Sequence, residues 1–289
     1  ALAEMCRVLK PGGRLAFAGE PTTVGNTYAR SLSTLTWRAA TNVTKLPGLG
    51  GWRRPQAELD ESSRAAAYGP SRCTRVPAGR SAGPALGSVE ELGAWVLALL
   101  AAANMPDGAR VSLAGHSMGS LIALEAAAQA PQRCERLLML ATAWPMKVSE
   151  ALFSRARENP RSAMALVNSL SHASLAAKPS YPGPGAWLHG GNQALMERMQ
   201  ASSCEPHLFL HDFGLCDRYQ GAPAAAAAVR EAGRPAYLIL GERDVMTPPK
   251  AAQALGELLQ ADVRRLPAGH SLMTEAPEAL LNAFKGACP

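Results

Sequence analysis

The feature that most constrains this chain is a Gly-His-Ser-Met-Gly segment, Gly115 to Gly119, between an apolar strand and a helix. Residues 111–114 are largely apolar and predict a short buried strand, and residues 120–128 predict a helix. A strand that turns at once into a helix forces the residue at the turn, Ser117, into a strained backbone conformation. Gly115 and Gly119 suit such a turn because they have no side chains that would clash there.

Ser117 at this turn is a candidate nucleophile. The N-terminus of the following helix lies behind it and favours negative charge. The backbone N–H of Met118 would face the same point and serve as an oxyanion donor. A chance occurrence of the five-residue pattern is the alternative, but a chance match seldom has a strand on one side and a helix on the other. We therefore predict that Ser117 acts as a nucleophile.

The chain from Ser88 onward alternates helices and strands. Ser88 and Glu91 form a capping box that predicts the start of a helix. Three apolar runs predict further buried strands, over residues 136–142, 235–241 and 261–266. A closing helix is predicted over residues 277–287. This alternation predicts an α/β fold with a parallel sheet flanked by helices. The segment at about 145–232 breaks the alternation and predicts a helical lid insertion.

Two more residues follow predicted strands in positions that suit catalysis. A serine nucleophile needs a base to take its proton and an acid to orient that base. Asp244 and His270 each come just past the end of a predicted strand, and such loops gather at one edge of a parallel sheet. As alternatives, Asp244 would be a helix-entry cap, with Glu242 the other carboxylate nearby, and His270 an ordinary loop histidine. His116, beside the nucleophile, is expected to pack under the turn rather than to catalyse.

From about Val76 to its end the chain resembles the α/β-hydrolase fold family. The resemblance lies in Gly115 to Gly119, in Leu240 to Asp244 with Pro248 beyond, and in Ala268 to Ser271. It implies a partial α/β-hydrolase fold and a serine hydrolase that acts on an ester or related acyl compound. It also implies the roles of nucleophile for Ser117, acid for Asp244 and base for His270. The expected partner is a small-molecule acyl substrate, and no cofactor is expected.

Residues 1–65 predict a different origin. The unit from Cys6 to Leu15, a helix followed by Pro-Gly-Gly and a strand, resembles the late part of class I S-adenosylmethionine-dependent methyltransferases. The resemblance implies a methyltransferase-like C-terminal fragment without a cofactor pocket, and an ordinary helix–strand unit fits the pattern equally well. Residues 66–87 are rich in Gly and Pro and predict a linker or junction before the α/β-hydrolase core at 88–289.

In the α/β-hydrolase family, further strands come earlier in the chain than the strand that leads to the nucleophile. The front part of this chain leaves no room for them before Ser117. We therefore expect that strand to have an exposed apolar edge, and the oxyanion hole to lack its second donor. Docking of the strand at 14–19 on this edge is the less favoured alternative. The chain is then an impaired serine hydrolase or a catalytically dead fusion remnant with a binding or scaffolding role. A methyltransferase remnant is a minor alternative, and a gene-model artefact stays open.

Composition excludes several other functions. The 29 Lys and Arg residues exceed the 23 Asp and Glu residues, but they are spread singly, which does not suit nucleic-acid binding. The longest apolar run, Ala94 to Ala103, is too short to span a membrane. Six scattered cysteines indicate a soluble, reducing compartment such as the cytoplasm. One further cluster has zinc-binding residue types, but its apolar neighbours indicate packing and no metal is expected: Cys204, His207, His211, Asp212 and Cys216.

Overall fold

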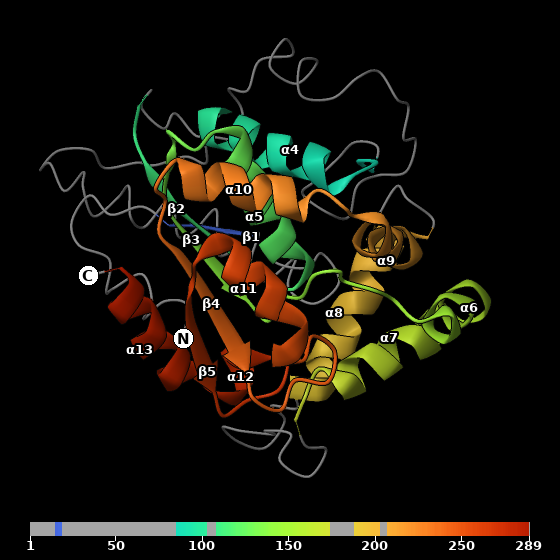
Figure 1. Cartoon of the computed structure of the whole chain (residues 1–289). Coiled ribbons are helices and arrows are strands. Elements are labelled where there is room, and N and C mark those ends of the chain that lie inside the picture. Colours follow the sequence, from blue (N-terminus) through green and yellow to red (C-terminus); the bar gives the residue numbers. More distant parts are fainter. Residues whose placement is uncertain (1–14, 19–84, 103–107, 174–187, 203–206, 289) are drawn as a thin grey trace, which may run out of the picture.

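The computed structural model describes residues 15–18, 85–102, 108–173, 188–202 and 207–288 (Figure 1). Within these ranges the chain forms a five-stranded sheet in the order β1-β2-β3-β4-β5, with every neighbouring pair parallel. The strands are β1 (Leu15–Ala18), β2 (Val111–His116), β3 (Cys134–Leu140), β4 (Ala236–Gly241) and β5 (Asp262–Leu266). The predicted α/β class, a parallel sheet flanked by helices, is confirmed.

Helices cover both faces of this sheet because alternate strand residues point to opposite sides. Leu137 and Met139 belong to the core that lies under one group of helices, and Leu138 and Leu140 belong to the core on the other side. The first core is covered by α4 (Val89–Ala102), α5 (Met118–Gln129), α10 (Ala222–Glu231) and α11 (Gln253–Leu259). The second core is covered by α12 (Leu272–Glu275) and α13 (Pro277–Ala287). Figure 1 shows α13 apart from the α4, α5 and α10 group.

Strand β2 and helix α5 form the centre of the molecule. All six residues of β2 are buried, and α5 is buried from Met118 through Ala127. The alanine-rich sequence of α5 allows this, because small side chains let a helix pack closely on a sheet and on α4 and α10 at once. The turn between β2 and α5 is therefore held on all sides by packed structure.

The chain between β3 and β4 forms a second helical group. Helices α6 (Glu150–Glu158), α7 (Pro160–Leu170), α8 (Leu188–Ser202) and α9 (Leu208–Arg218) have an apolar core of their own. In that core the rings of Phe209 and Phe213 meet edge to face, with centroids 4.4 Å apart. Figure 1 shows α6 to α9 beside the sheet, whereas α10, which also lies in the segment predicted as a lid, packs on α5.

Strand β1 lies along the free edge of β2. The two strands are parallel, and their register pairs Leu15 with Ser112 and Ala18 with Gly115. Our expectation of an exposed β2 edge is therefore wrong, and the disfavoured docking of this strand is what the structure contains. An unpaired edge would leave backbone N–H and C=O groups of a buried strand without partners. The entropic cost of closing a long connection grows only slowly with its length. The free energy gained by pairing β1 with β2 therefore exceeds this cost.

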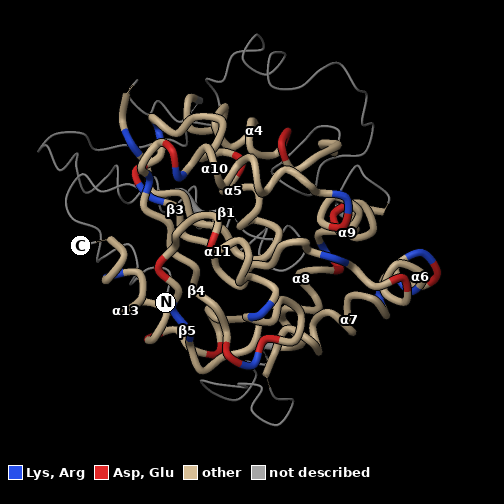
Figure 2. The backbone as a smooth tube through the Cα atoms, in the orientation of Figure 1, with Lys and Arg blue, Asp and Glu red and all other residues tan. Residues whose placement is uncertain are grey.

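Two predictions about the surface can be followed in the described part of the chain. Figure 2 shows Lys and Arg interspersed with Asp and Glu along the visible backbone rather than gathered in one stripe. Within the described ranges, every helix falls short of the length and apolar character needed to cross a membrane. The helix predicted at residues 1–10 and most of the predicted linker lie outside the described residues.

Candidate active site

The turn between β2 and α5 places Ser117 in an unusual backbone conformation. Its φ is 54° and its ψ is −124°, a region that residues other than glycine rarely occupy. A Cβ at Gly115 would lie 1.9 Å from the carbonyl oxygen of Gly119, so only glycine fits at position 115. The Ser117 N–H donates to the Leu140 carbonyl at 2.9 Å, which ties the turn to the end of β3.

The neighbours of Ser117 hold its backbone and leave its hydroxyl available. The Ser117 carbonyl accepts hydrogen bonds from the Ser120 N–H at 2.8 Å and the Ser120 hydroxyl at 2.5 Å. Ser117 precedes α5 without a side-chain capping bond, so its hydroxyl does not serve as a cap. Met118 opens the helix, where backbone N–H groups have no partner within the helix. The positive end of α5 therefore lies next to Ser117.

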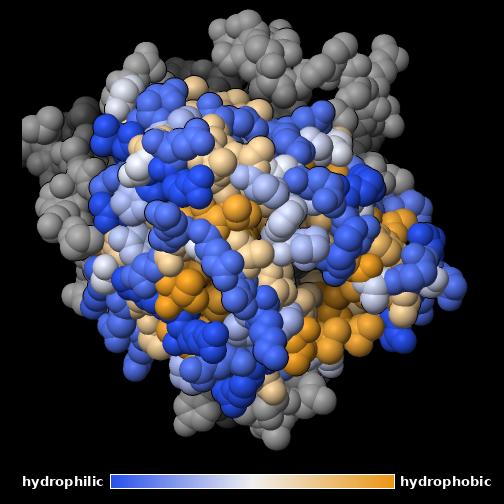
Figure 3. Space-filling model, in the orientation of Figure 1, coloured by the Kyte–Doolittle hydropathy of each residue, from blue (hydrophilic) through white to orange (hydrophobic). Residues whose placement is uncertain are grey.

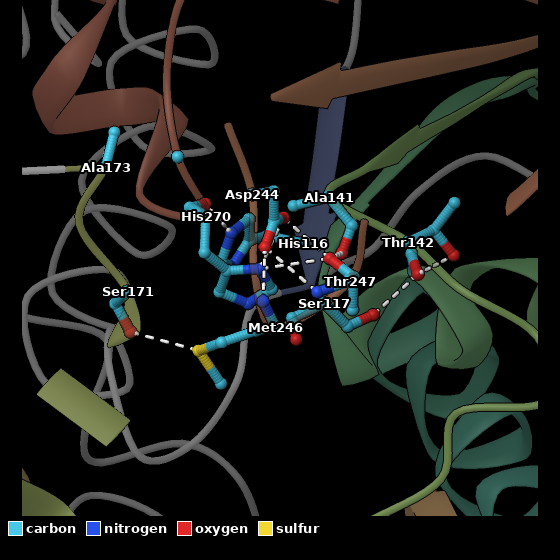
Figure 4. Close-up of polar contacts among 12 residues, drawn as sticks. His116, Ser117, Ala141, Thr142, Ser171, Ala173, Asp244, Met246, Thr247 and His270 are labelled. Atoms are coloured by element: carbon cyan, nitrogen blue, oxygen red, sulfur yellow. Dashed lines mark hydrogen bonds and ion pairs between the residues drawn. The ribbon is translucent and has the colours of Figure 1, made fainter. Parts of the chain in front are cut away.

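Asp244 and His270 come together at the same edge of the sheet. Asp244 follows β4 and His270 follows β5, and the Asp244 carboxylate oxygen Oδ2 lies 2.8 Å from His270 Nδ1 (Figure 4). The two loops approach closely because position 241 is glycine: a Cβ there would lie 2.2 Å from the Gly269 carbonyl oxygen. The Arg243 N–H donates to the Ala268 carbonyl at 3.0 Å and fixes the loops to each other.

The Asp244 carboxylate is fully hydrogen-bonded although it is only 4% exposed. Its Oδ1 accepts from the N–H groups of Met246 at 2.8 Å and Thr247 at 2.9 Å. Its Oδ2 accepts from the Thr247 hydroxyl at 2.7 Å and faces His270. Burial raises the pKa of this carboxyl, but the hydrogen bond and charge of His270 and the Thr247 bonds lower it more, to about 2. Asp244 therefore carries a negative charge at neutral pH.

The charge on Asp244 fixes the proton arrangement of His270. An ionised carboxylate only accepts hydrogen bonds, so Nδ1 of His270 carries the proton that is donated to Oδ2. In the neutral ring the lone pair is then on Nε2, the nitrogen that a general base uses. Thr247 Oγ1 also lies 3.0 Å from His270 Nδ1 and 2.9 Å from the Ala141 carbonyl oxygen, so its single proton is shared between that carbonyl and Asp244 Oδ2.

His116 has a closer relation to the site than the sequence predicts. It is 2% exposed, and its ring centroid lies 4.7 Å from that of His270. Its Nε2 lies 2.8 Å from the His270 carbonyl oxygen, which can only accept, so Nε2 donates. His116 thus packs beneath the turn, as expected, and also holds the backbone of His270 (Figure 4).

Sequence reasoning missed the role of Thr247. A threonine followed by proline is typical of the start of a helix, yet the chain there begins a 3₁₀ turn at Pro249 and continues into α11. The Thr247 side chain instead contacts Asp244, His270 and Ala141. The sequence feature that could have indicated this contact is the position of the threonine, three residues after the candidate acid.

Two of the zinc-type residues, His211 and Cys216, have other surroundings in the described part of the chain. His211 Nε2 donates to the Leu86 carbonyl at 2.8 Å, and Cys216 belongs to the core beneath α5. Cys204 lies outside the described residues. Across the described ranges, no three His, Cys, Asp or Glu side chains gather as metal ligands would.

Comparison with known proteins decides the family. The model of a family described as "Alpha/beta hydrolase family" matches residues 46–283, which is most of the chain. The chain belongs to the alpha/beta hydrolase family. The match starts within the residues that we predict as methyltransferase-like, and no comparison supports that resemblance. No curated protein matches the chain.

Solved hydrolase structures share the fold. A thermophilic esterase is 21% identical with a TM-score of 0.57, covering 72% of this chain and 76% of its own. An enol-lactonase from Burkholderia xenovorans LB400 is 20% identical with a TM-score of 0.56, covering 71% and 74%. The N-acyl homoserine lactone degrading enzyme Est816 is 20% identical with a TM-score of 0.58, covering 72% and 78%. At these identities the likeness establishes the alpha/beta hydrolase fold alone.

Proposed function

We propose that this alpha/beta hydrolase cleaves a carboxylic ester or related acyl compound with Ser117 as nucleophile, His270 as base and Asp244 as acid. The observation that carries the proposal is the 2.8 Å hydrogen bond between His270 and a buried, ionised Asp244, at the sheet edge where Ser117 occupies its strained turn. Esterase and lactonase activities named for structural neighbours agree with this chemistry.

The reaction proceeds through an acyl-enzyme. His270 Nε2 takes the Ser117 hydroxyl proton as Oγ attacks the acyl carbon, and the carbonyl oxygen becomes an oxyanion. The ionised Asp244 stabilises the resulting imidazolium. Nε2 then gives its proton to the leaving alcohol oxygen as the bond to the acyl carbon breaks. A water molecule then attacks the acyl carbon as Nε2 takes its proton. Nε2 gives this proton to Ser117 Oγ as the bond from Oγ to the acyl carbon breaks, which releases the acid.

The Met118 N–H and the N-terminus of α5 would stabilise the oxyanion. A second donor would have to come from a neighbouring strand end. The C-terminal end of β1 pairs with Gly115, two residues before the nucleophile. Because β1 places such a strand end beside the turn, we propose that the hydrolase is less impaired than the sequence predicts.

Helices α6 to α9 are proposed as the lid. The end of α7 already contacts the His270 loop, because the Ser271 N–H donates to the Ser171 carbonyl at 2.8 Å. Figure 3 shows apolar surface in the region where α7 and α8 lie in Figure 1. Such a surface suits the acyl part of a substrate.

Burst kinetics with a short-chain nitrophenyl ester test the proposal. A rapid release of about one nitrophenolate per enzyme, followed by slower turnover, is expected because an acyl-Ser117 forms and then hydrolyses. Ser117→Ala should lose both phases. Ser154→Ala is a matched control, because it removes a hydroxyl from a half-buried position on α6, outside the turn between β2 and α5. A burst in Ser117→Ala would contradict the proposal, and no turnover in the wild type would favour the binding or scaffolding alternative.

A further inference from the structure

Glu275, the last residue of α12, connects two segments that are far apart in the sequence. Its Oε1 accepts the Gly269 N–H at 3.2 Å, and its Oε2 accepts the Ala173 N–H at 2.9 Å. Gly269 immediately precedes His270, and Ala173 follows the end of α7 in the second helical group. One carboxylate therefore joins the loop of the candidate base to the proposed lid.

The two joined segments touch through their backbones. A Cβ at Gly269 would lie 2.6 Å from the Ala173 nitrogen, so glycine is required where the chains meet. Two N–H donors that face the same space cannot bond to each other, and each needs an acceptor. A carboxylate supplies two acceptor oxygens in one group and bonds more strongly than a neutral acceptor. Glu275 thus meets the requirement of both donors.

The same stretch of chain also reaches the loop of the candidate acid. The Ser171 hydroxyl lies 3.4 Å from the sulfur of Met246, whose N–H donates to the Asp244 carboxylate. The Ser171 carbonyl accepts the Ser271 N–H on the other side of His270. Figure 4 shows Ser171 and Ala173 beside the His270 and Asp244 group. His270 is therefore flanked on both sides by bonds to the end of α7, and Glu275 makes the bond on one side.

We propose that Glu275 is a positioning residue that fixes His270 by holding Gly269 against Ala173, and that it links the placement of the base to the placement of α7. The inference rests on the proposed function, because His270 is taken as the base. Without the carboxylate, the N–H groups of Gly269 and Ala173 would each lose the acceptor that Glu275 provides, at a point where the two backbones are in contact. The His270 loop would then move away from the end of α7, and the imidazole would shift from the place where it bonds to Asp244.

Three variants separate positioning from general support of the fold. Glu275→Ala removes both acceptors, and Glu275→Gln keeps one oxygen and presents an N–H₂ to the other donor. Glu278→Ala is the matched control, because it removes the same charge three residues away at an exposed position in the first turn of α13. The measurements are kcat and KM with a nitrophenyl ester, thermal unfolding, and hydrogen exchange at the Gly269 and Ala173 amides.

Misplacement of a catalytic group by about 1 Å costs roughly a hundredfold in rate, so Glu275→Ala should lower kcat by about ten- to a hundredfold. KM should change by less than about threefold, because the bonds that are lost go to backbone N–H groups of Gly269 and Ala173 and not to apolar side chains of the proposed lid. Glu275→Gln should be intermediate, and both amides should exchange faster in Glu275→Ala. Glu278→Ala should match the wild type in all four measurements.

Two results would overturn the inference. One is a folded Glu275→Ala with kcat within about twofold of the wild type, and the other is a loss of kcat without faster exchange at Gly269 and Ala173. If Glu275→Ala does not fold, Glu275→Gln takes its place. An unchanged kcat in Glu275→Gln, or a loss of kcat without faster exchange at the Gly269 and Ala173 amides, would then overturn the inference. A wild type without turnover would refute the proposed function itself, which is a separate outcome.

Discussion

Replacing Asp244 by asparagine should change how the stability of the protein depends on pH. The wild-type carboxylate accepts two backbone N–H bonds on Oδ1, and on Oδ2 it accepts from the Thr247 hydroxyl and faces His270. Asparagine has one oxygen, so its N–H₂ must face either the backbone pair or the imidazole. It also has no charge to titrate. The variant is therefore less stable than the wild type at neutral pH.

The size of the pH effect follows from the pKa of Asp244, which folding lowers from 3.8 to about 2. This difference corresponds to about 2 kcal/mol in the free energy of unfolding. Because the folded state has the lower pKa, the stabilisation is present above the unfolded value and is lost as pH falls through the folded value. Between pH 6 and pH 3 this carboxyl therefore loses about 1 kcal/mol of its contribution.

Urea unfolding at pH 6, 4 and 3 measures this contribution. The stability gap between the wild type and Asp244→Asn should narrow by about 1 kcal/mol from pH 6 to pH 3. Asp262→Asn is the control, because it removes an exposed carboxylate and leaves Asp244 intact. The difference in the free energy of unfolding between Asp262→Asn and Asp244→Asn should narrow by the same amount as the difference between the wild type and Asp244→Asn. A gap between wild type and Asp244→Asn that stays constant with pH would refute the reasoning.

Two further predictions concern the turn and the sheet edge. Gly115→Ala should abolish turnover and lower stability by more than about 3 kcal/mol, because the new Cβ would lie 1.9 Å from a backbone oxygen. Gly191→Ala, in open space on α8, should instead be neutral or stabilising, and thermal unfolding with an ester assay compares the two. Removal of residues 1–65 takes β1 from the β2 edge and should lower ester turnover at least a hundredfold or leave the protein insoluble. Unchanged turnover in a soluble truncated protein would show that β1 has no part in the site.

The elements around Ser117 could be predicted because their patterns are local. Apolar runs mark β2 and β4, and the closing helix α13 spans the residues expected for it. Parallel strands that share one sheet must end at one edge, so loops that follow them meet there. This rule brings Asp244 and His270 together without any knowledge of the contacts between them.

The contacts that the sequence did not predict join residues far apart in the chain. Strand β1 pairs across almost a hundred positions, Leu15 with Ser112, and the Pro-Gly-Gly unit before it led us to expect a separate fragment. Glu275 accepts from an N–H 102 residues away, a bond that no local pattern announces. The local pattern at Thr247 favours helix capping, as hydroxyl residues before a helix do, whereas its side chain contacts the Asp244 carboxylate and the Ala141 carbonyl.

The central claim is that Ser117 is a nucleophile activated by His270. The most direct test is a fluorophosphonate probe followed by mass spectrometry of the intact protein and its peptides. A nucleophilic Ser117 should give one adduct per chain, on the peptide that contains Ser117. Ser117→Ala should give no adduct, and His270→Ala should be labelled at least about a thousandfold more slowly. An adduct on another residue, or labelling that persists in Ser117→Ala, would contradict it.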